Sequence, residues 1–148
     1  MIWGWLNVIT FVIISFSIGI VMEIIGTKTG SIFGGKYKFN LKLSPGPSIY
    51  GIPLIIPLSW SGLIYMIIKY CELVLGGFLY FLQNQNITLL FLPSILMVLL
   101  DLVLDPIAVD EKRWSWKKSG AYYGVPLLNF VGWLFTCLLY TSPSPRDP

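Results

Sequence analysis

Two aspartates stand out at the end of an otherwise apolar segment. In the stretch LLDLVLDP, Leu99 to Pro106, Asp101 and Asp105 are four residues apart and follow a run made almost entirely of Ile, Leu, Met and Val. A spacing of four places both carboxyl groups on one face of a helix. Because like charges there repel, one acid is favoured to keep its proton and can serve as a proton donor.

A third acid, Glu23, lies near the end of the first apolar run. Acids at membrane depth are costly and usually face the interior of a helix bundle, where they often have a role. The simpler interpretation of Glu23 or Asp105 taken alone is a helix end that lies in water. Asp101 fits that interpretation less well, because it is a full turn deeper in the apolar run.

The chain contains no His, which excludes a His general base and metal or haem ligation by imidazole. Any proton chemistry therefore falls to carboxylates, Tyr, Lys or water. Cys71 and Cys137 are both in apolar surroundings and indicate neither a disulfide framework nor a thiolate metal site. No metal and no cofactor are predicted, and the glycines of the loops match no nucleotide-binding pattern.

Aromatic residues form a second candidate set. Trp60 and Trp133 can line a pocket in which their π faces stabilise a cation. Trp and Tyr are also typical of the membrane interface, and for Trp114 and Trp116 that interfacial belt is the favoured interpretation.

The composition is that of a membrane protein. The 148 residues are 55% hydrophobic and 11% charged, and the mean hydropathy is +0.75. No Lys or Arg precedes the first apolar run and no small-residue cleavage site ends it, so we interpret it as a membrane helix rather than a secretory signal.

We therefore expect an all-α fold, a polytopic transmembrane bundle with about four spans in this chain. The FGGKYKFNLKL part of the first loop is expected to form a short strand pair. The expected spans run from Ile2 to Ile25, within Tyr50 to Leu82, from Thr88 to Asp105, where Pro106 ends the helix, and from Tyr122 onward.

Charge decides how often the long apolar region Tyr50–Leu82 crosses. With a single crossing, the two Lys-rich loops on either side of the second and third helices share one face of the membrane, whereas a double crossing would separate them. The positive-inside rule favours the single crossing, with both basic loops cytoplasmic. Lys69 and Glu72 inside that crossing are spaced to pair with each other. This topology brings Glu23, both aspartates and the Tyr122–Tyr123 pair to the cytoplasmic side.

The last residues change style abruptly. Cys137 to Ser142 can be encoded by TGTCTCTTATACACATCT, which looks like the mosaic end of a transposon-based sequencing adapter, and SPSPRD fits its continuation in the same frame. We therefore divide the chain into a partial membrane domain, residues 1–136, and adapter read-through that is not native, residues 137–148.

Several blocks of the chain resemble a known family. EIIGTKTGSIFGGKYKFN, YGIPLIIPLSW, DLVLDPIAV and WSWKKSGAYYGVPLLNFVGW, in this order and spacing, are similar to the membrane carotenoid-biosynthesis family. Its studied members include hydratases of acyclic carotenoid end groups, such as the bisanhydrobacterioruberin and gamma-carotene hydratases. The resemblance covers about Met22 to Phe135. Members of this family are longer, with further membrane helices, so we expect this chain to be a fragment.

The resemblance implies a cofactor-independent carbon–oxygen lyase that adds water across a terminal C=C of a long isoprenoid and yields a tertiary alcohol. Under this hypothesis Asp101 or Asp105 is the acid and Glu23 is its partner. The expected substrate contacts are Trp60, Tyr122, Tyr123, Asn129 and Trp133, with Asn129 placing the water. The substrate is lipid-soluble, membrane lipids surround the protein, other carotenoid-biosynthesis enzymes are candidate partners, and no nucleic acid is expected.

A second hypothesis belongs to another class. Glu23, Asp101 and Asp105 would also suit a proton or cation path in a transporter, or a non-catalytic membrane scaffold. Intramembrane acids by themselves do not distinguish a relay from an acid catalyst. The absence of an inverted repeat in the sequence speaks against the transporter.

Overall fold

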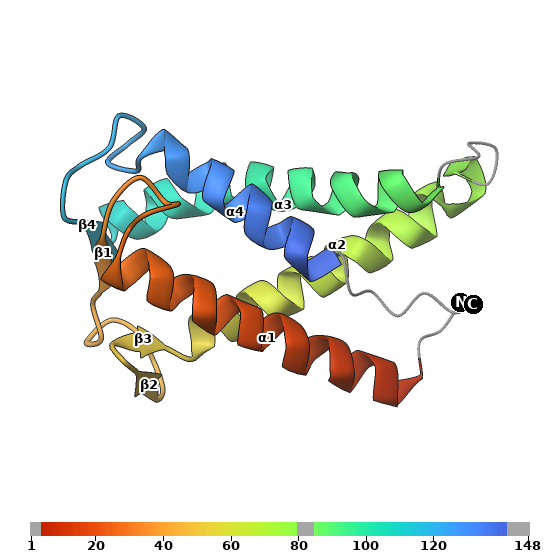
Figure 1. The fold of residues 1–148 in the computed structure, drawn as a ribbon, viewed down its shortest axis with the longest axis horizontal. Coiled ribbons are helices and arrows are strands. Elements are labelled where there is room, and N and C mark those ends of the chain that lie inside the picture. The colour runs from red at the N-terminus through yellow and green to blue at the C-terminus, as the bar shows by residue number, and fades with distance from the viewer. Residues whose placement is uncertain (1–3, 80–84, 142–148) are drawn as a thin grey trace.

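The computed structural model describes the backbone of residues 4–79 and 85–141, and the side chains of residues 4–74 and 90–141. Within these residues the chain forms four helices and two small strand pairs (Figure 1). The helices are α1 (Trp5–Lys28), α2 (Ile55–Leu79), α3 (Gln85–Asp110) and α4 (Leu127–Thr141). The strands are β1 (Tyr37–Phe39), β2 (Ser48–Ile49), β3 (Ile52–Pro53) and β4 (Trp114–Trp116).

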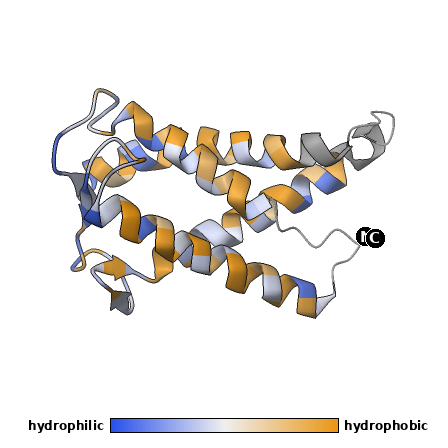
Figure 2. Ribbon diagram, in the orientation of Figure 1, coloured by the Kyte–Doolittle hydropathy of each residue, from blue (hydrophilic) through white to orange (hydrophobic). Residues whose placement is uncertain are grey.

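Apolar residues extend along all four helices (Figure 2). Many of their side chains are exposed, and several polar side chains are buried. Ile13, Met66 and Val103 are each more than half exposed, whereas Ser61 and Asn129 are buried. Such a distribution suits surroundings that are themselves apolar. Two helices, Trp5–Lys28 and Leu90–Asp110, are long and apolar enough to cross a membrane by length and composition.

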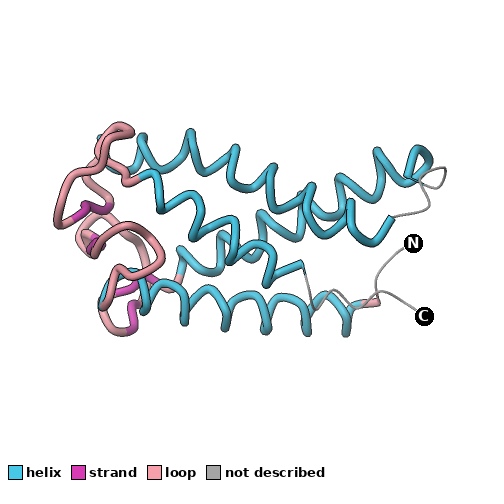
Figure 3. The backbone as a smooth tube through the Cα atoms, turned by 45° about the horizontal axis from the view of Figure 1, so that its top comes forward, coloured by secondary structure: helices cyan, strands magenta, loops and turns pink. Residues whose placement is uncertain are grey.

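Most of the long second apolar region forms one continuous helix, and the single membrane crossing that the charge pattern favours for it stays a prediction. α2 runs without a break from Ile55 to Leu79, and inside it Lys69 Nζ lies 2.6 Å from Glu72 Oε2, which confirms the expected ion pair. The loops before α2 and after α3 meet at the same end of the bundle (Figure 3). Their cytoplasmic location stays a prediction.

The strand predicted within FGGKYKFNLKL is present as β1, but its predicted partner in the same loop is wrong. β1 pairs antiparallel with β4 of the second basic loop, with Tyr37 opposite Trp116 and Phe39 opposite Trp114. Aromatic side chains stacked across the two strands explain the choice, since the Tyr37 and Trp116 ring centroids are 4.6 Å apart. The first loop also contains its own hairpin, formed by β2 and β3.

Several helix boundaries differ from the predictions. α1 continues past Ile25 to Lys28, and α3 begins at Gln85 rather than Thr88. α4 begins at Leu127 rather than Tyr122. Tyr123 (φ 49°) and Gly124 (φ 87°) adopt left-handed backbone conformations, which form a tight turn and cannot belong to a right-handed helix.

Some sequence predictions fall partly outside the described residues. These are residues 2–3 at the start of the first expected span, residues 80–82 at the end of the second apolar region, and residues 142–148 of the suspected adapter. The remainder of that last segment, Cys137 to Thr141, belongs to α4. Its origin from an adapter stays a prediction.

Pro106 does not end the third helix, contrary to the prediction. Proline lacks the N–H that would donate to the carbonyl four residues earlier, here that of Leu102. The Tyr122 hydroxyl donates a hydrogen bond of 3.1 Å to this same carbonyl oxygen. α3 continues to Asp110, and a residue from the next loop satisfies the acceptor that Pro106 leaves open.

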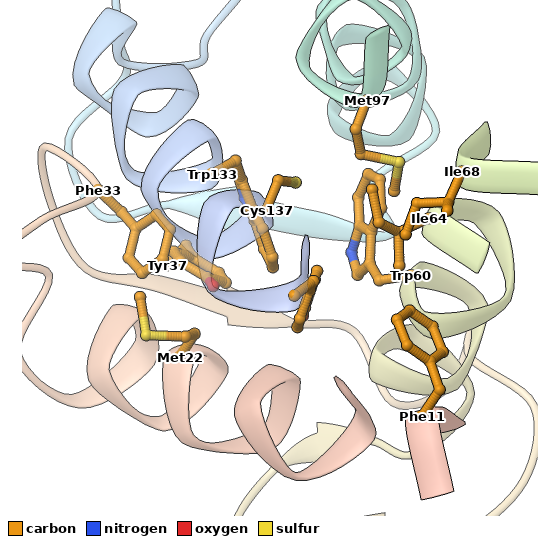
Figure 4. Close-up of a cluster of buried hydrophobic side chains, with 11 residues drawn as sticks. Phe11, Met22, Phe33, Tyr37, Trp60, Ile64, Ile68, Met97, Trp133 and Cys137 are labelled. Carbon is orange, nitrogen blue, oxygen red and sulfur yellow. The ribbon is translucent and has the colours of Figure 1, made fainter. Parts of the chain in front are cut away.

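The core lies where the four helices meet (Figure 4). Trp60 of α2 and Trp133 of α4 pack with ring centroids 5.2 Å apart and planes inclined by 31°. Phe11 of α1 and Met97 of α3 are buried in the same cluster. Both indoles also line the site described below.

We expect Tyr122→Phe to lower the free energy of unfolding by about 1 kcal/mol, because the Leu102 carbonyl loses its donor. Denaturant titration in detergent micelles would measure the change. Tyr123→Phe is the matched control, since Tyr123 is 73% exposed, and should change little.

Pro106→Ala restores the backbone N–H, so Tyr122→Phe should cost less in that background than in the native chain. Equal costs in the two backgrounds would show that Tyr122 does not substitute for the proline N–H.

Candidate functional site

Three carboxylic acids converge in the interior of the bundle. Glu23 of α1 and Asp101 of α3 are each 1% exposed, and Asp105 of α3 is 4% exposed. The spacing of four puts both aspartates on the buried face of α3, and they lie close enough to Glu23 to act on it electrostatically. Acids this deeply buried need hydrogen-bond partners or a functional reason to be there.

Glu23 is held by a residue from the first loop. The Tyr37 hydroxyl donates a 2.5 Å hydrogen bond to Glu23 Oε2. Burial, together with the Glu23 carboxyl beside it, raises the pKa of Tyr37 well above its usual range. Tyr37 is therefore a neutral donor at any physiological pH, and it fixes one oxygen of Glu23 in place.

Asp105 is held by a residue of the last helix. Asn129 Nδ2 donates a 2.6 Å hydrogen bond to Asp105 Oδ2, and both side chains are buried. The other amide atom, Asn129 Oδ1, is buried and has no hydrogen-bond partner among the described residues. Asn129 thus orients the aspartate and retains an acceptor for a further donor.

Asp101 has a different environment. Neither of its carboxyl oxygens has a hydrogen-bond partner among the described residues, although the side chain is 1% exposed. Leaving a buried polar group unpaired costs about 1–3 kcal/mol, so its presence in an apolar helix calls for an explanation.

A small cavity opens between the two partnered acids. Its volume is about 20 Å³, which is room for one water molecule. Glu23, Asp105 and Asn129 supply its polar lining, and aromatic rings supply most of the rest. These rings belong to Tyr37, Phe39, Trp60, Trp114, Trp116 and Trp133.

The cavity unites most of the residues that the sequence singled out. Glu23, Asp105, Trp60, Asn129 and Trp133 all line it. Three others do not: Asp101 is buried nearby, Tyr122 is half-buried and bonded to the Leu102 carbonyl, and Tyr123 is largely exposed. Among the described residues, no group of three His, Cys, Asp or Glu side chains is arranged to hold a metal ion.

Sequence reasoning missed the aromatic residues of β1 and β4. Tyr37 and Phe39, and likewise Trp114 and Trp116, alternate along short strands and so share one strand face. Trp114 and Trp116 also line the cavity, and the interfacial belt expected for them stays a prediction. The alternation in YKF and WSW was the available signal.

Comparison with known proteins adds to this geometry. A family model described as carotenoid biosynthesis protein matches residues 1–143. The chain belongs to the carotenoid biosynthesis protein family. Membership indicates a role in carotenoid biosynthesis and an isoprenoid substrate. Searches of curated proteins and of solved structures found no match.

For this carotenoid biosynthesis protein we expect Gly26→Ala to disturb the site. A Cβ on Gly26 would lie 2.5 Å from Tyr37 Cε1 and 2.6 Å from its hydroxyl oxygen, so the ring must leave Glu23. The free energy of unfolding should fall by about 1–3 kcal/mol, measured by denaturant titration in micelles.

Gly62→Ala is the matched control, because it is also a helical glycine and a Cβ there meets nothing within 4 Å. It should leave stability unchanged or raise it by up to about 1 kcal/mol through helix propensity. Equal effects at the two glycines would contradict the close packing of Tyr37 against α1.

Proposed function

We propose that this protein is an integral membrane hydratase, which adds water across a terminal C=C of an acyclic carotenoid end group and gives a tertiary alcohol. One observation carries the proposal: a cavity with room for one water lies between two buried acids and against indole rings. Hydration of an alkene proceeds by proton transfer to the C=C and then by attack of water on the resulting cation. It therefore needs a proton donor, a water molecule and groups that stabilise the cation.

Asp105 is the proposed acid. Of the two aspartates considered, it is the one that lines the cavity. Its proton adds to the less substituted carbon of the terminal C=C, the π electrons form the new C–H bond, and a tertiary cation remains on the neighbouring carbon. Asn129 keeps the carboxyl group in one orientation through its 2.6 Å hydrogen bond.

Trp60 and Trp133 are the proposed cation-stabilising residues. Both line the cavity, and their offset, tilted packing presents indole surface to it. An indole face attracts a cation by about 2 kcal/mol or more when both are desolvated.

Glu23 is the proposed base. Water held between Glu23 and Asn129 Oδ1 attacks the cation, and the water oxygen forms the new C–O bond. One of its protons stays on the new hydroxyl group, and the other passes to Glu23. A proton returned from Glu23 to Asp105 restores the starting state, so the reaction consumes only alkene and water. Tyr37 holds Glu23 in place for this proton transfer through the hydrogen bond that its hydroxyl donates.

Replacing the acids tests the assignment. In a bacterial host that accumulates an acyclic carotenoid, we expect the full-length gene to yield hydroxylated pigment, measured by chromatography and mass spectrometry. Asp105→Asn and Glu23→Gln should each lower the yield by about 100-fold or more, because each removes one proton-transfer group. Asp101→Asn should lower it less, since Asp101 does not line the cavity.

Asp110→Asn is the matched control, an exposed aspartate on the same helix, and should not change the yield. Unchanged yield from both Asp105→Asn and Glu23→Gln would remove the catalytic assignment. A full-length native protein that produces no hydroxylated pigment would overturn the hydratase itself, and proton- or cation-dependent flux would then favour the transporter.

We also propose that all four helices span the membrane with both basic loops in the cytoplasm. The exposed apolar faces of α2 and α4, for example at Met66 and Val131, support this arrangement alongside α1 and α3. Lys-rich loops at one end of the bundle agree with the positive-inside rule.

Single cysteines at Ser31 and Ser115, with Cys71 and Cys137 replaced by Ala, would test this topology. Both should react with a membrane-impermeant maleimide only after the membrane is opened, because both lie in the loops at the cytoplasmic end. Labelling of the two positions from opposite sides would contradict the proposed topology.

A further inference from the structure

An apolar groove lies between α2 and α3 at the loop end of the bundle. Its volume is about 290 Å³. Ile56, Trp60 and Leu63 of α2 form one wall, and Leu104, Ile107 and Ala108 of α3 form the other. Pockets of this size with mostly apolar walls are typical binding sites for small apolar ligands.

The groove lies next to the small cavity lined by Glu23, Asp105 and Asn129, called the carboxylate cavity below. Ile56, Trp60 and Trp114 line both spaces, so these three side chains form the boundary between them. A ligand in the groove would therefore have its inner end against Trp60, beside the acids.

The loop end of the groove has a polar border. Glu111 and Arg113 line it there and form an ion pair with each other, and both side chains are about half exposed. A long apolar molecule would therefore leave the groove along the apolar outer faces of α2 and α3, where Met66, Leu99 and Val103 are exposed.

We propose that the α2/α3 groove binds the polyene chain of the isoprenoid, with its terminal unit inserted past Trp60 and Trp114 toward Asp105. This inference rests on the proposed hydratase function and adds the route by which the substrate reaches the site. The substrate enters sideways from the lipid phase between two helices, end group first.

A larger groove on the other side of α2 is the natural competitor. It has a volume of about 600 Å³ and lies between α1, the start of α2 and the Pro45–Pro47 segment. None of its lining residues lines the carboxylate cavity. We therefore choose the α2/α3 groove because it borders the carboxylate cavity, although the other groove has the larger volume.

Two serines allow a matched test. Ser59 lines the α2/α3 groove, and Ser17 lines the larger groove between α1 and the start of α2, called the α1/α2 groove below. Both are exposed helical residues whose hydroxyl donates a 2.7 Å hydrogen bond to the carbonyl four residues earlier. Ser59→Trp and Ser17→Trp therefore fill different grooves with the same side chain at the same local cost.

The measurement is the amount of the host's acyclic carotenoid that stays bound to the purified chain, followed by its absorbance, in an Asp105→Asn background. Hydroxylated product is measured in parallel in the native background. We expect Ser59→Trp to lower both by about tenfold and Ser17→Trp to change neither, because only Ser59 borders the route to the acids. Size-exclusion chromatography checks that each variant is folded.

Loss of pigment with Ser17→Trp alone would overturn the inference in favour of the α1/α2 groove. Equal loss with both variants, loss with neither, or no bound pigment in the Asp105→Asn chain would also overturn it. If pigment binding follows the expected pattern but the native chain makes no hydroxylated product, the groove stands and the hydratase fails.

Discussion

The burial of ionisable carboxyl groups inside an apolar helix bundle is the constraint on which the rest of this structure depends. Two of the three acids receive a hydrogen bond, and in each case the donor comes from another element: Tyr37 for Glu23, and Asn129 for Asp105. A buried acid without such a donor costs considerably more. The first loop must therefore fold back onto α1, and α4 must pack against α3, before the site exists.

The small sheet at the loop end meets part of this requirement. Pairing of β1 with β4 joins two loops that are far apart in the sequence, and it sets Tyr37 against Trp116 over the carboxylates. Gly26 contributes by having no Cβ, since the Tyr37 ring occupies the space that a Cβ would need. Together these features close the polar cavity on its loop side with aromatic rings.

Pro106 shows how local and distant interactions combine around the acids. The residue directly after Asp105 removes a backbone donor, yet α3 continues, and the Tyr122 hydroxyl bonds the Leu102 carbonyl that is left without that donor. Continuation of the helix past Pro106 adds Ile107 and Ala108 to α3, and these residues form one wall of the apolar groove. A single side-chain hydrogen bond from the last loop thus connects helix continuity with the shape of the proposed substrate route.

What the sequence by itself determined is local in origin. Composition and apolar run length indicate membrane helices, a spacing of four places Asp101 and Asp105 on one face, and a spacing of three pairs Lys69 with Glu72. The same reasoning selected Glu23, Asp105, Trp60, Asn129 and Trp133, which all meet at the cavity. What only the tertiary structure decided involves partners distant in the chain: the pairing of β1 with β4, the place of Tyr37, Trp114 and Trp116 beside the acids, the donor from Tyr122 that lets α3 pass Pro106, and the connection from groove to cavity. Helical periodicity specifies which residues share a face of one element, whereas these contacts depend on how separate elements pack against each other.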